Sequence, residues 1–340
     1  MEASIITTYR CPMRCKMCNI WANPTDSNKE FKPELLKKLP KLKLVNLTGG
    51  EPLVRDDIED IIKILFTKTK RVVISTNGWF DEKIFKIAEK FPNVGFRVSL
   101  EGLSQKNDEL RGQTGGFDRG LSVILGLRRM GIKDIGFGIT VSNNNSKDML
   151  CLYELARELR VEFATAAFHN SFYFHKYDNV ITNLEEVSAD FEELINRLIH
   201  EPHPKSWFRA FFNVGLVNYI KGNRRLLPCE AGTENFFIDP YGEVLPCNGM
   251  EKRYWFLSMG NLHKVSNFMQ IWKSQRAEEV RQKVKECPKN CWMIGSVSPV
   301  MKKYLTKIIP WVLKNKIKSL SGKRIYCDLF PSFDFGQKLY

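Results

Sequence analysis

The sequence lacks any hydrophobic run long enough to cross a bilayer. None of its apolar stretches reaches the roughly 18 consecutive residues that a transmembrane helix needs. The first ten residues, MEASIITTYR, have no basic segment followed by an apolar one. We therefore expect no membrane-spanning helix, no secretory signal and a cytoplasmic location. Internal repeats and low-complexity stretches are also missing, which argues against solenoid and disordered classes.

Acidic residues are absent from residues 302–324, which hold eight of the 52 lysines and arginines. The net charge of +14 falls to +6 once these eight basic residues are set aside, so nucleic-acid binding is not expected of the whole chain. Aliphatic residues and Trp311 lie among these lysines, and Pro310 is expected to kink or split a helix there. The segment 301–324 suits peripheral contact with an anionic membrane surface. It also suits packing on the protein with the lysines outward, which we favour.

The remaining composition is that of an ordinary globular protein of 340 residues, with 43% hydrophobic and 26% charged positions. This length allows one large domain, or a domain with a smaller module. Nine cysteines are present. Without a secretory signal they indicate a reducing compartment, where cysteines are more often metal ligands than disulfide partners.

Short β-branched runs alternate with amphipathic stretches over the first 200 residues. The runs predict strands at Ser4–Thr8, Leu44–Thr48, Arg71–Ser75, Val94–Leu100, Ile135–Val141 and Val161–Phe168. The amphipathic stretches predict helices near Pro33–Leu39, Asp56–Thr67, Asp81–Lys90, Phe117–Met130, Ser146–Leu159 and Leu184–Ile199. This alternation predicts an α/β fold, a partial (β/α)6 TIM barrel whose chemistry lies beyond the carboxyl ends of its parallel strands.

The alternation stops near residue 200, where the segment EPHPKSW (201–207) is typical of a boundary. We expect the barrel over residues 1–204, a small cysteine-bearing domain over 205–300, and a basic amphipathic tail over 301–340.

Three cysteines follow the first predicted strand within one short loop. Cys11, Cys15 and Cys18 have the spacing C-x3-C-x2-C. Three thiolates on one loop can hold three irons of a 4Fe–4S cluster, which leaves the fourth iron open to an external ligand. A zinc site or buried cysteines are the alternatives, but a structural zinc ion usually takes four protein ligands and no fourth is nearby.

Glycines and polar residues follow the other predicted strands at the same edge of the sheet. Thr48-Gly49-Gly50-Glu51-Pro52 follows the second strand, and its glycines allow close backbone approach to a ligand, although a tight turn also explains them. Asn77 lies at the end of the third strand. Ser99 and Glu101, two apart on an extended segment, point to one side and could hydrogen-bond a ribose. Arg111 could clamp a carboxylate.

The cysteine loop, the Gly-Gly-Glu-Pro segment and the Ser-Leu-Glu-Gly segment, in this order, resemble the motifs of the radical SAM superfamily. The resemblance covers roughly residues 1–200. It implies that the three cysteines bind a 4Fe–4S cluster whose open iron is chelated by the amino and carboxylate groups of S-adenosylmethionine (SAM).

The resemblance also assigns the expected SAM contacts. Residues 48–52 would contact the methionyl amino group, Ser99 and Glu101 the ribose, and Arg111 the carboxylate, as in SPASM-type members, with Asn77 among the further contacts. Met17 stands where members usually carry an aromatic residue near the adenine, a space that methionine can fill.

A second cysteine set follows the predicted barrel and consists of Cys229, Cys247, Cys287 and Cys291. A hairpin is predicted over Phe236–Cys247, and a helix near Phe268–Val284 precedes the last pair. Four thiolates can ligate one further 4Fe–4S cluster or a structural zinc ion. The pattern resembles SPASM and Twitch modules over about residues 225–295, and the lack of a dense C-x2-C-x5-C segment favours the Twitch form with one auxiliary cluster. Cys327 is expected to be a spare thiol, and Cys151 a core residue.

The resemblance implies an enzyme that cleaves SAM reductively to methionine and a 5′-deoxyadenosyl radical, which abstracts hydrogen from a substrate carbon. An auxiliary cluster can accept an electron, so we expect dehydrogenation or formation of a carbon–sulfur or carbon–carbon bond. The expected substrate is a sugar, a peptide or a lipid-linked molecule, and the expected electron donor is a ferredoxin or flavodoxin. No catalytic acid or base is predicted, although His169 could be a proton acceptor or simply structural. The alternative function is a non-catalytic iron–sulfur or zinc protein that binds RNA through its basic face.

Overall fold

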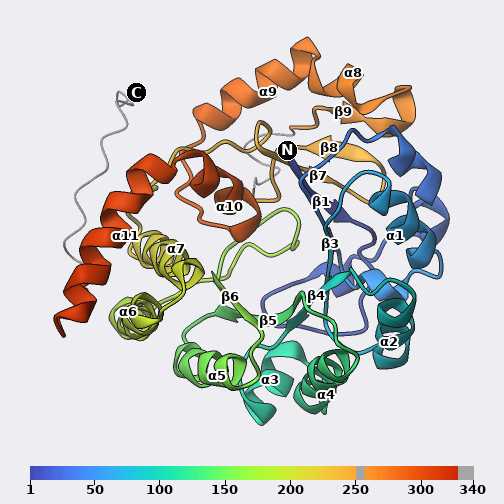
Figure 1. Ribbon diagram of the computed structural model, residues 1–340. Coiled ribbons are helices and arrows are strands. Elements are labelled where there is room, and N and C mark those ends of the chain that lie inside the picture. Colours follow the sequence, from blue (N-terminus) through green and yellow to red (C-terminus); the bar gives the residue numbers. More distant parts are fainter. Residues whose placement is uncertain (250–256, 328–340) are drawn as a thin grey trace.

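The computed structural model describes residues 1–249 and 257–327. Within these ranges, the strands form one sheet in the order β6-β5-β4-β3-β2-β1-β7-β8-β9. The first six strands are β1 (Glu2–Ile6), β2 (Leu44–Thr48), β3 (Val72–Thr76), β4 (Gly95–Ser99), β5 (Ile135–Val141) and β6 (Glu162–Ala167). They pair in parallel and curve into an open barrel with helices on its outer side (Figure 1). The predicted partial (β/α)6 barrel is confirmed.

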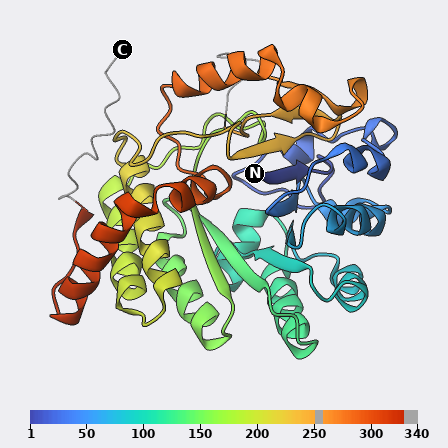
Figure 2. The same ribbon diagram turned by 45° about the horizontal axis from the view of Figure 1, so that its top comes forward.

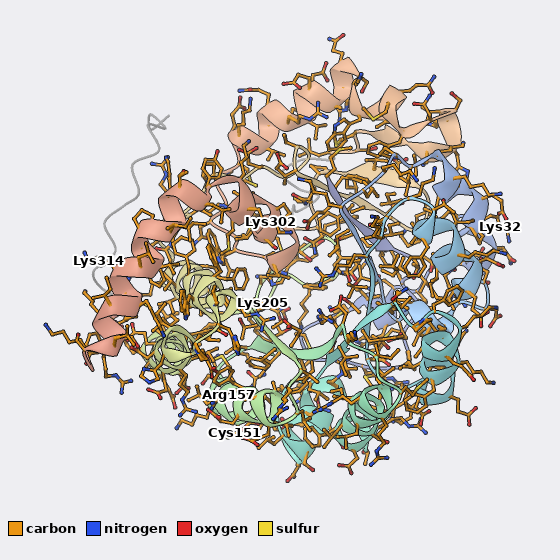
Figure 3. All side chains as sticks on the ribbon, viewed as in Figure 1. Lys32, Cys151, Arg157, Lys205, Lys302 and Lys314 are labelled. Carbon is orange, nitrogen blue, oxygen red and sulfur yellow. The ribbon has the colours of Figure 1, made fainter. Side chains whose placement is uncertain are left out.

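Five of the predicted helices form within two residues of their expected ends. They are α1 (Ile58–Phe66), α2 (Asp81–Lys90), α4 (Gly116–Arg129), α5 (Ser146–Glu158) and α6 (Leu184–His200). Pro33–Lys38 forms a 3-10 helix instead of an α-helix. The buried side of α5 consists of Ser146, Met149, Leu152, Tyr153 and Ala156. Cys151 lies away from this side and is exposed (Figure 3), so our expectation that it is a core residue was wrong.

Two helices of the barrel region were not predicted. The short helix α3 (Ser104–Arg111) is strongly polar, so it has no apolar stripe to give a helical period. In contrast, α7 (Pro204–Ile220) is continuously buried over residues 210–217, because it packs against α6 and β6 and also contacts α11 (Leu305–Leu320). A helix that is apolar around most of its circumference shows no amphipathic pattern either.

The C-terminal hairpin is an extension of the barrel sheet. Strand β7 (Asn235–Ile238) pairs in parallel with β1, and β8 (Glu243–Leu245) returns antiparallel to β7 before β9 (Gly260–Asn261). The Asp239 side chain closes the turn by accepting from the backbone N–H groups of Tyr241 (2.9 Å) and Glu243 (2.8 Å). The hairpin forms as predicted, and it lies next to the first barrel strand.

The helix expected over Phe268–Val284 is two helices, α8 (Phe268–Trp272) and α9 (Gln275–Lys285). They divide at Ser274, whose hydroxyl caps α9 by accepting from Ala277 N–H at 3.1 Å.

The end of the described chain forms α10 (Ile294–Lys303) and α11, and α11 runs through Pro310 without splitting. Figure 2 shows α11, in red, along the outside of α6 and α7, so the described part of the basic tail packs on the protein as we favoured, whereas positions 328–340 lie outside the described residues. Among the described residues, no helix has both the length and the apolar character needed to span a membrane.

Candidate iron–sulfur and SAM site

The three-cysteine loop leaves the end of β1 through an anchored turn. A buried carboxylate, that of Glu30, accepts from Thr8 Oγ1 (2.5 Å) and forms an ion pair with Arg10 (2.9 Å). Arg55 lies 3.5 Å from the same carboxylate and donates to Thr7 O at 2.9 Å. A buried, paired network of this kind fixes backbone position, because leaving any member unpaired is costly.

The two glycines after β2 lie against the start of the cysteine loop. Gly50 N–H donates to Thr8 O (2.7 Å), and Glu51 N–H donates to Arg10 O (2.9 Å). A Cβ at Gly50 would overlap the Arg10 carbonyl group, and a Cβ at Gly49 would overlap Thr8 O. These glycines therefore permit close approach of two protein segments, whereas the sequence had suggested approach to a ligand.

The Glu51 side chain joins the ends of β2 and β3. It is fully buried and accepts from Thr76 Oγ1 (2.9 Å) and from Asn77 N–H (2.7 Å). Burial raises the pKa of Glu51 to about 7, against the opposing effect of these hydrogen bonds. Asn77 in turn places its Nδ2 3.9 Å from Cys11 Sγ, so the end of β3 meets the cysteine loop.

A buried ion pair joins the ends of β4 and α3. Arg111 Nη1 donates to Glu101 Oε1 at 3.2 Å, and Arg111 Nε donates to Met13 Sδ at 3.1 Å. The other Glu101 oxygen accepts from Thr140 N–H on β5 (2.6 Å). Both charged side chains are less than a tenth exposed. Burial raises the pKa of Cys15, and the positive charge of Arg111 opposes this rise.

The remaining predicted SAM contacts are Ser99 and Met17. Ser99 is half-buried at the end of β4, and Met17 is buried, with its carbonyl accepting from Asn179 Nδ2 at 3.1 Å. The loop after β6, which carries Asn179, also brings Tyr173 to this place, where its hydroxyl donates to Gly49 O at 2.7 Å. Tyr173 and Asn179 were not predicted to belong to this site, and the one signal for them in the sequence is their position after a strand's carboxyl end.

The four C-terminal cysteines line one cavity. Cys247 lies just beyond β8, whereas Asn290 in the Cys287–Cys291 loop donates to Tyr219 O on α7 (3.2 Å). Trp292 Nε1 likewise donates to a carbonyl group of α7 at 2.8 Å. The second cysteine set therefore bridges α7, which packs on the last barrel strand, and the hairpin beside β1.

Two cysteines belong to neither set. Cys327 is buried, and its N–H donates to Glu192 Oε1 on α6 at 3.1 Å. Cys151 is exposed on α5. Neither residue lines the cavity of the four C-terminal cysteines, so both stay outside the ligand sets that we predicted.

Both cysteine sets fit iron–sulfur clusters by their chemistry. Burial raises the pKa of Cys11 and Cys18 to about 12 and that of Cys291 to about 11. Neighbouring thiolates of the same set contribute to each of these rises, so a bound cation is needed to hold these sulfurs ionised. In the described ranges, no three Cys, His, Asp or Glu side chains are grouped so that they could hold a single metal ion. A site made only of cysteine thiols suits a 4Fe–4S cluster, in which each thiolate binds a separate iron.

His169 is held in one tautomer. Its Nδ1 lies 2.9 Å from Ala167 O, so Nδ1 carries the proton and Nε2 presents a lone pair. The Nε2 atom is buried and has no hydrogen-bond partner among the described residues. Burial lowers the pKa of His169, which favours this neutral form.

A small apolar cluster connects the two cysteine sets. Its buried members are Ile6, Tyr9, Ile20, Tyr173 and Phe237. Cys18 packs on this cluster, and so does Leu245, two residues before Cys247. The first set and the hairpin of the second set therefore share one packed boundary.

Comparison with known proteins agrees with this arrangement. Residues 5–156 match the Radical SAM superfamily, and residues 229–293 match the SPASM iron–sulfur cluster-binding domain. The chain is 30% identical to the Fe-coproporphyrin III synthase of Methanosarcina barkeri over 163 residues, which are 45% of this chain and only 40% of that synthase. It is 29% identical to the AdoMet-dependent heme synthase of the same organism over 274 residues, covering 74% of this chain and 73% of that protein.

The fold also matches that of a solved structure. The crystal structure of SuiB from Streptococcus suis has a TM-score of 0.63 to this chain at 17% identity, over 83% of this chain and 67% of SuiB. The two domain matches include all seven cysteines of the two sets. The chain thus contains a radical SAM domain over residues 5–156 and a C-terminal SPASM iron–sulfur cluster-binding domain over residues 229–293.

Proposed function

We propose that this chain cleaves SAM reductively and oxidises a substrate at a carbon–hydrogen bond, with one auxiliary 4Fe–4S cluster as the acceptor of the substrate's electron. When bound, the first cluster and SAM supply one-electron cleavage to methionine and a 5′-deoxyadenosyl radical. The observation that carries the proposal is the presence of two cysteine sets, one of three thiols and one of four. The apolar cluster around Tyr173 joins Cys18 of the first set to Leu245 in the hairpin that leads to the second.

The chain's own residues would hold and shield these cofactors. Cys11, Cys15 and Cys18 would bind the first cluster, and Cys229, Cys247, Cys287 and Cys291 the auxiliary one. Residues 48–52, Asn77, Ser99 and Met17 would lie around SAM. Arg111 would keep a positive charge beside the thiolates while Glu101 holds it in place, since the two are ion-paired at 3.2 Å. The loop that carries Tyr173 would exclude water from the mouth of the barrel.

For the substrate we propose a peptide, one of the three classes that the sequence had suggested. SuiB has also been crystallised bound to its precursor peptide SuiA, in a structure that covers 82% of this chain at a TM-score of 0.59. His169 Nε2 would accept a hydrogen bond from a substrate N–H or O–H group, because it is buried without a partner in the described part of the chain. The electron donor would be a ferredoxin or flavodoxin.

A tetrapyrrole is the second candidate substrate. The observation in its favour is the similarity to the AdoMet-dependent heme synthase, which extends over 73% of that protein. The two candidates differ in what a product search should find, a modified peptide or a modified macrocycle.

The test is anaerobic reconstitution with iron and sulfide, followed by dithionite and SAM. The proposal predicts release of 5′-deoxyadenosine and methionine, and iron and sulfide contents of about eight each per chain, from four per cluster. A non-catalytic iron–sulfur or zinc protein would release neither product. The substrate class follows from comparing the peptides and metabolites of a deletion strain with those of a strain that carries Cys15→Ala, since the true product would be missing from both.

A further inference from the structure

Helix α11 has two adjoining apolar faces, one buried and one exposed. One face is buried and contains Ile308 and Val312. It packs against α6 and α7, where the Trp311 ring lies 5.3 Å from the ring of Phe211. Lys316 also attaches α11 to α6, because its Nζ donates to three carbonyl groups at the end of α6 at 2.9–3.0 Å. This buried face therefore holds α11 on the barrel.

The second apolar face of α11, which we name the outward stripe, points away from the protein. Its members recur every third or fourth residue and are 39%, 41%, 52%, 67% and 71% exposed, in the order Leu305, Ile309, Leu313, Ile317 and Leu320. At 3.6 residues per turn, the first four lie within an arc of about 120° that adjoins the buried face. Such a continuous exposed row is typical of a surface that contacts a partner.

The charge around the outward stripe has one sign. Lys307, Lys314 and Lys318 form the next side of α11, and no acidic residue occurs over positions 302–327. Figure 3 shows Lys314 at the outer edge of the molecule. Lysines in this position can extend their ammonium groups to phosphate headgroups while an aliphatic stripe faces acyl chains.

We propose that the outward face of α11 docks on an anionic lipid bilayer. The outward stripe enters the interfacial layer, and the lysines beside it contact the headgroups. Charge complementarity selects this partner, because a segment with lysines and no acids is attracted to a negatively charged surface. The sequence had offered packing and membrane contact as alternatives, and the two faces of α11 allow both at once. The inference is independent of the proposed reaction.

The experiment is sedimentation of the full-length, reconstituted protein with vesicles of phosphatidylcholine alone or with about 30 mol% phosphatidylglycerol, at low and high salt. We expect binding to the anionic vesicles that weakens with salt. Lys314→Gln with Lys318→Gln should lower the partition coefficient about 25-fold, since each lysine near such a surface contributes about fivefold. Leu313→Gln with Ile317→Gln should lower it at least about tenfold.

Matched controls carry the same changes on other faces of the molecule. Lys63→Gln with Lys86→Gln removes two exposed lysines from α1 and α2, and Val180→Gln changes an apolar residue that is 60% exposed. These variants should bind like the unmodified protein. None of the four α11 positions in the test is buried, so their variants should keep the far-ultraviolet circular dichroism and thermal midpoint of the unmodified protein.

Three results would overturn the proposal. The first is the absence of binding to anionic vesicles, and the second is binding that the α11 variants share unchanged. The third is a different occupant of the stripe. A dimer in sedimentation velocity that Leu313→Gln with Ile317→Gln dissociates would assign the stripe to a second copy of the chain. Vesicle binding that appears only after removal of residues 328–340 would assign it to the chain's own C-terminal segment.

Discussion

The two cysteine sets are built in different ways. The first set comes from one loop of eight residues, and the surrounding strand ends hold that loop through backbone contacts, as the Gly50 and Glu51 N–H groups show. The second set draws its cysteines from three separate segments, which meet only because the hairpin extends the barrel sheet and the Cys287–Cys291 loop attaches to α7. Local spacing defines the first site, whereas tertiary packing defines the second.

Damage at the first site should therefore leave the second intact. The position of the three thiols depends on the backbone that packs against their loop. Adding one methyl group to that backbone, by a glycine-to-alanine substitution, should therefore disrupt the first set alone. The second set should keep its geometry after such a change. The first loop and the hairpin meet only through Cys18 and Leu245 at the apolar cluster around Tyr173, and no cysteine of the second set belongs to that cluster.

The largest expected effect comes from removing one cysteine of each set in turn. Cys15→Ala should reduce 5′-deoxyadenosine release to the background without enzyme, because the first cluster loses one of its three ligands. Cys247→Ala should still release 5′-deoxyadenosine but should fail to form oxidised product. Each variant should retain about four irons of the expected eight. Equal loss of 5′-deoxyadenosine in both variants would show that the sets do not have separate roles.

A Gly50→Ala substitution tests the anchoring of the first loop. The added Cβ would come within 2.8 Å of Tyr9 O, and so would push the cysteine loop away from β2. We expect loss of about four irons and of SAM cleavage, with the auxiliary cluster retained. Gly295→Ala is the matched control, since a Cβ there has ordinary contacts of 3.6 Å with Phe237 and 3.7 Å with Ser4. Full iron content in Gly50→Ala would contradict the anchoring role.

The Glu101–Arg111 pair should matter for stability as well as for the site. Arg111→Gln leaves a buried carboxylate without its partner, which should lower the free energy of unfolding by about 3–5 kcal/mol. Chemical denaturation of the apoprotein measures this change. The exposed pair of Lys147 and Glu186, 2.9 Å apart, provides the control, and Lys147→Gln should have no measurable effect. Similar stability of both variants would mean that groups other than Arg111 stabilise the buried carboxylate of Glu101.

A smaller effect is expected at the amino end of the barrel sheet. Partial burial would raise the pKa of Asp134, but hydrogen bonding to Arg71 and the charge of Arg97 outweigh it and lower the pKa to about 2. The ionised carboxylate therefore stabilises the fold above its unfolded pKa near 3.8, by about 1–2 kcal/mol, and this stabilisation is lost as the pH falls towards 2.

Asp134→Asn should lower the free energy of unfolding at neutral pH. It should also remove the part of the pH dependence of this free energy that comes from Asp134, as urea unfolding at several pH values would measure. SAM cleavage and iron content should stay unchanged. Arg71 and Asp134 lie at the amino ends of β3 and β5, opposite to the first cysteine loop, and Arg97 reaches them from within β4. Strands β2 and β1 separate the three residues from the hairpin of the second set. An Asp134→Asn variant with lower iron content would contradict the separation of this stabilising ion pair from the two sites.

The barrel and its rim could be predicted from the sequence because each step is local. Alternating strands and helices define a parallel sheet, and parallel strands place the residues after Thr48, Thr76 and Ser99 at one edge. Helix α7 could not be predicted, since burial on most sides removes the amphipathic period. Tyr173 could not be predicted as a neighbour of Gly49 either, because 124 positions separate them and only the folded barrel brings them together.

The second cysteine set shows the same limit. Its four members were identified from residue type and the hairpin, but the pairing of β7 with β1 depends on contacts between distant parts of the chain. The sequence also does not explain why two glycines follow β2, because it does not show that the backbone of Thr8 and Arg10 occupies the space beside them. Residue type and spacing thus indicate the chemistry, and only the packing shows what holds it in place.

The most direct test of the central claim is electron paramagnetic resonance of dithionite-reduced Cys247→Ala, recorded with and without SAM. This variant lacks a ligand of the auxiliary cluster, so the signal should come from the first cluster alone. We predict a reduced 4Fe–4S signal whose spectrum changes when SAM is added, because the nucleotide binds the iron that Cys11, Cys15 and Cys18 leave open. A signal that SAM does not alter, or a variant without a reducible cluster, would contradict the account.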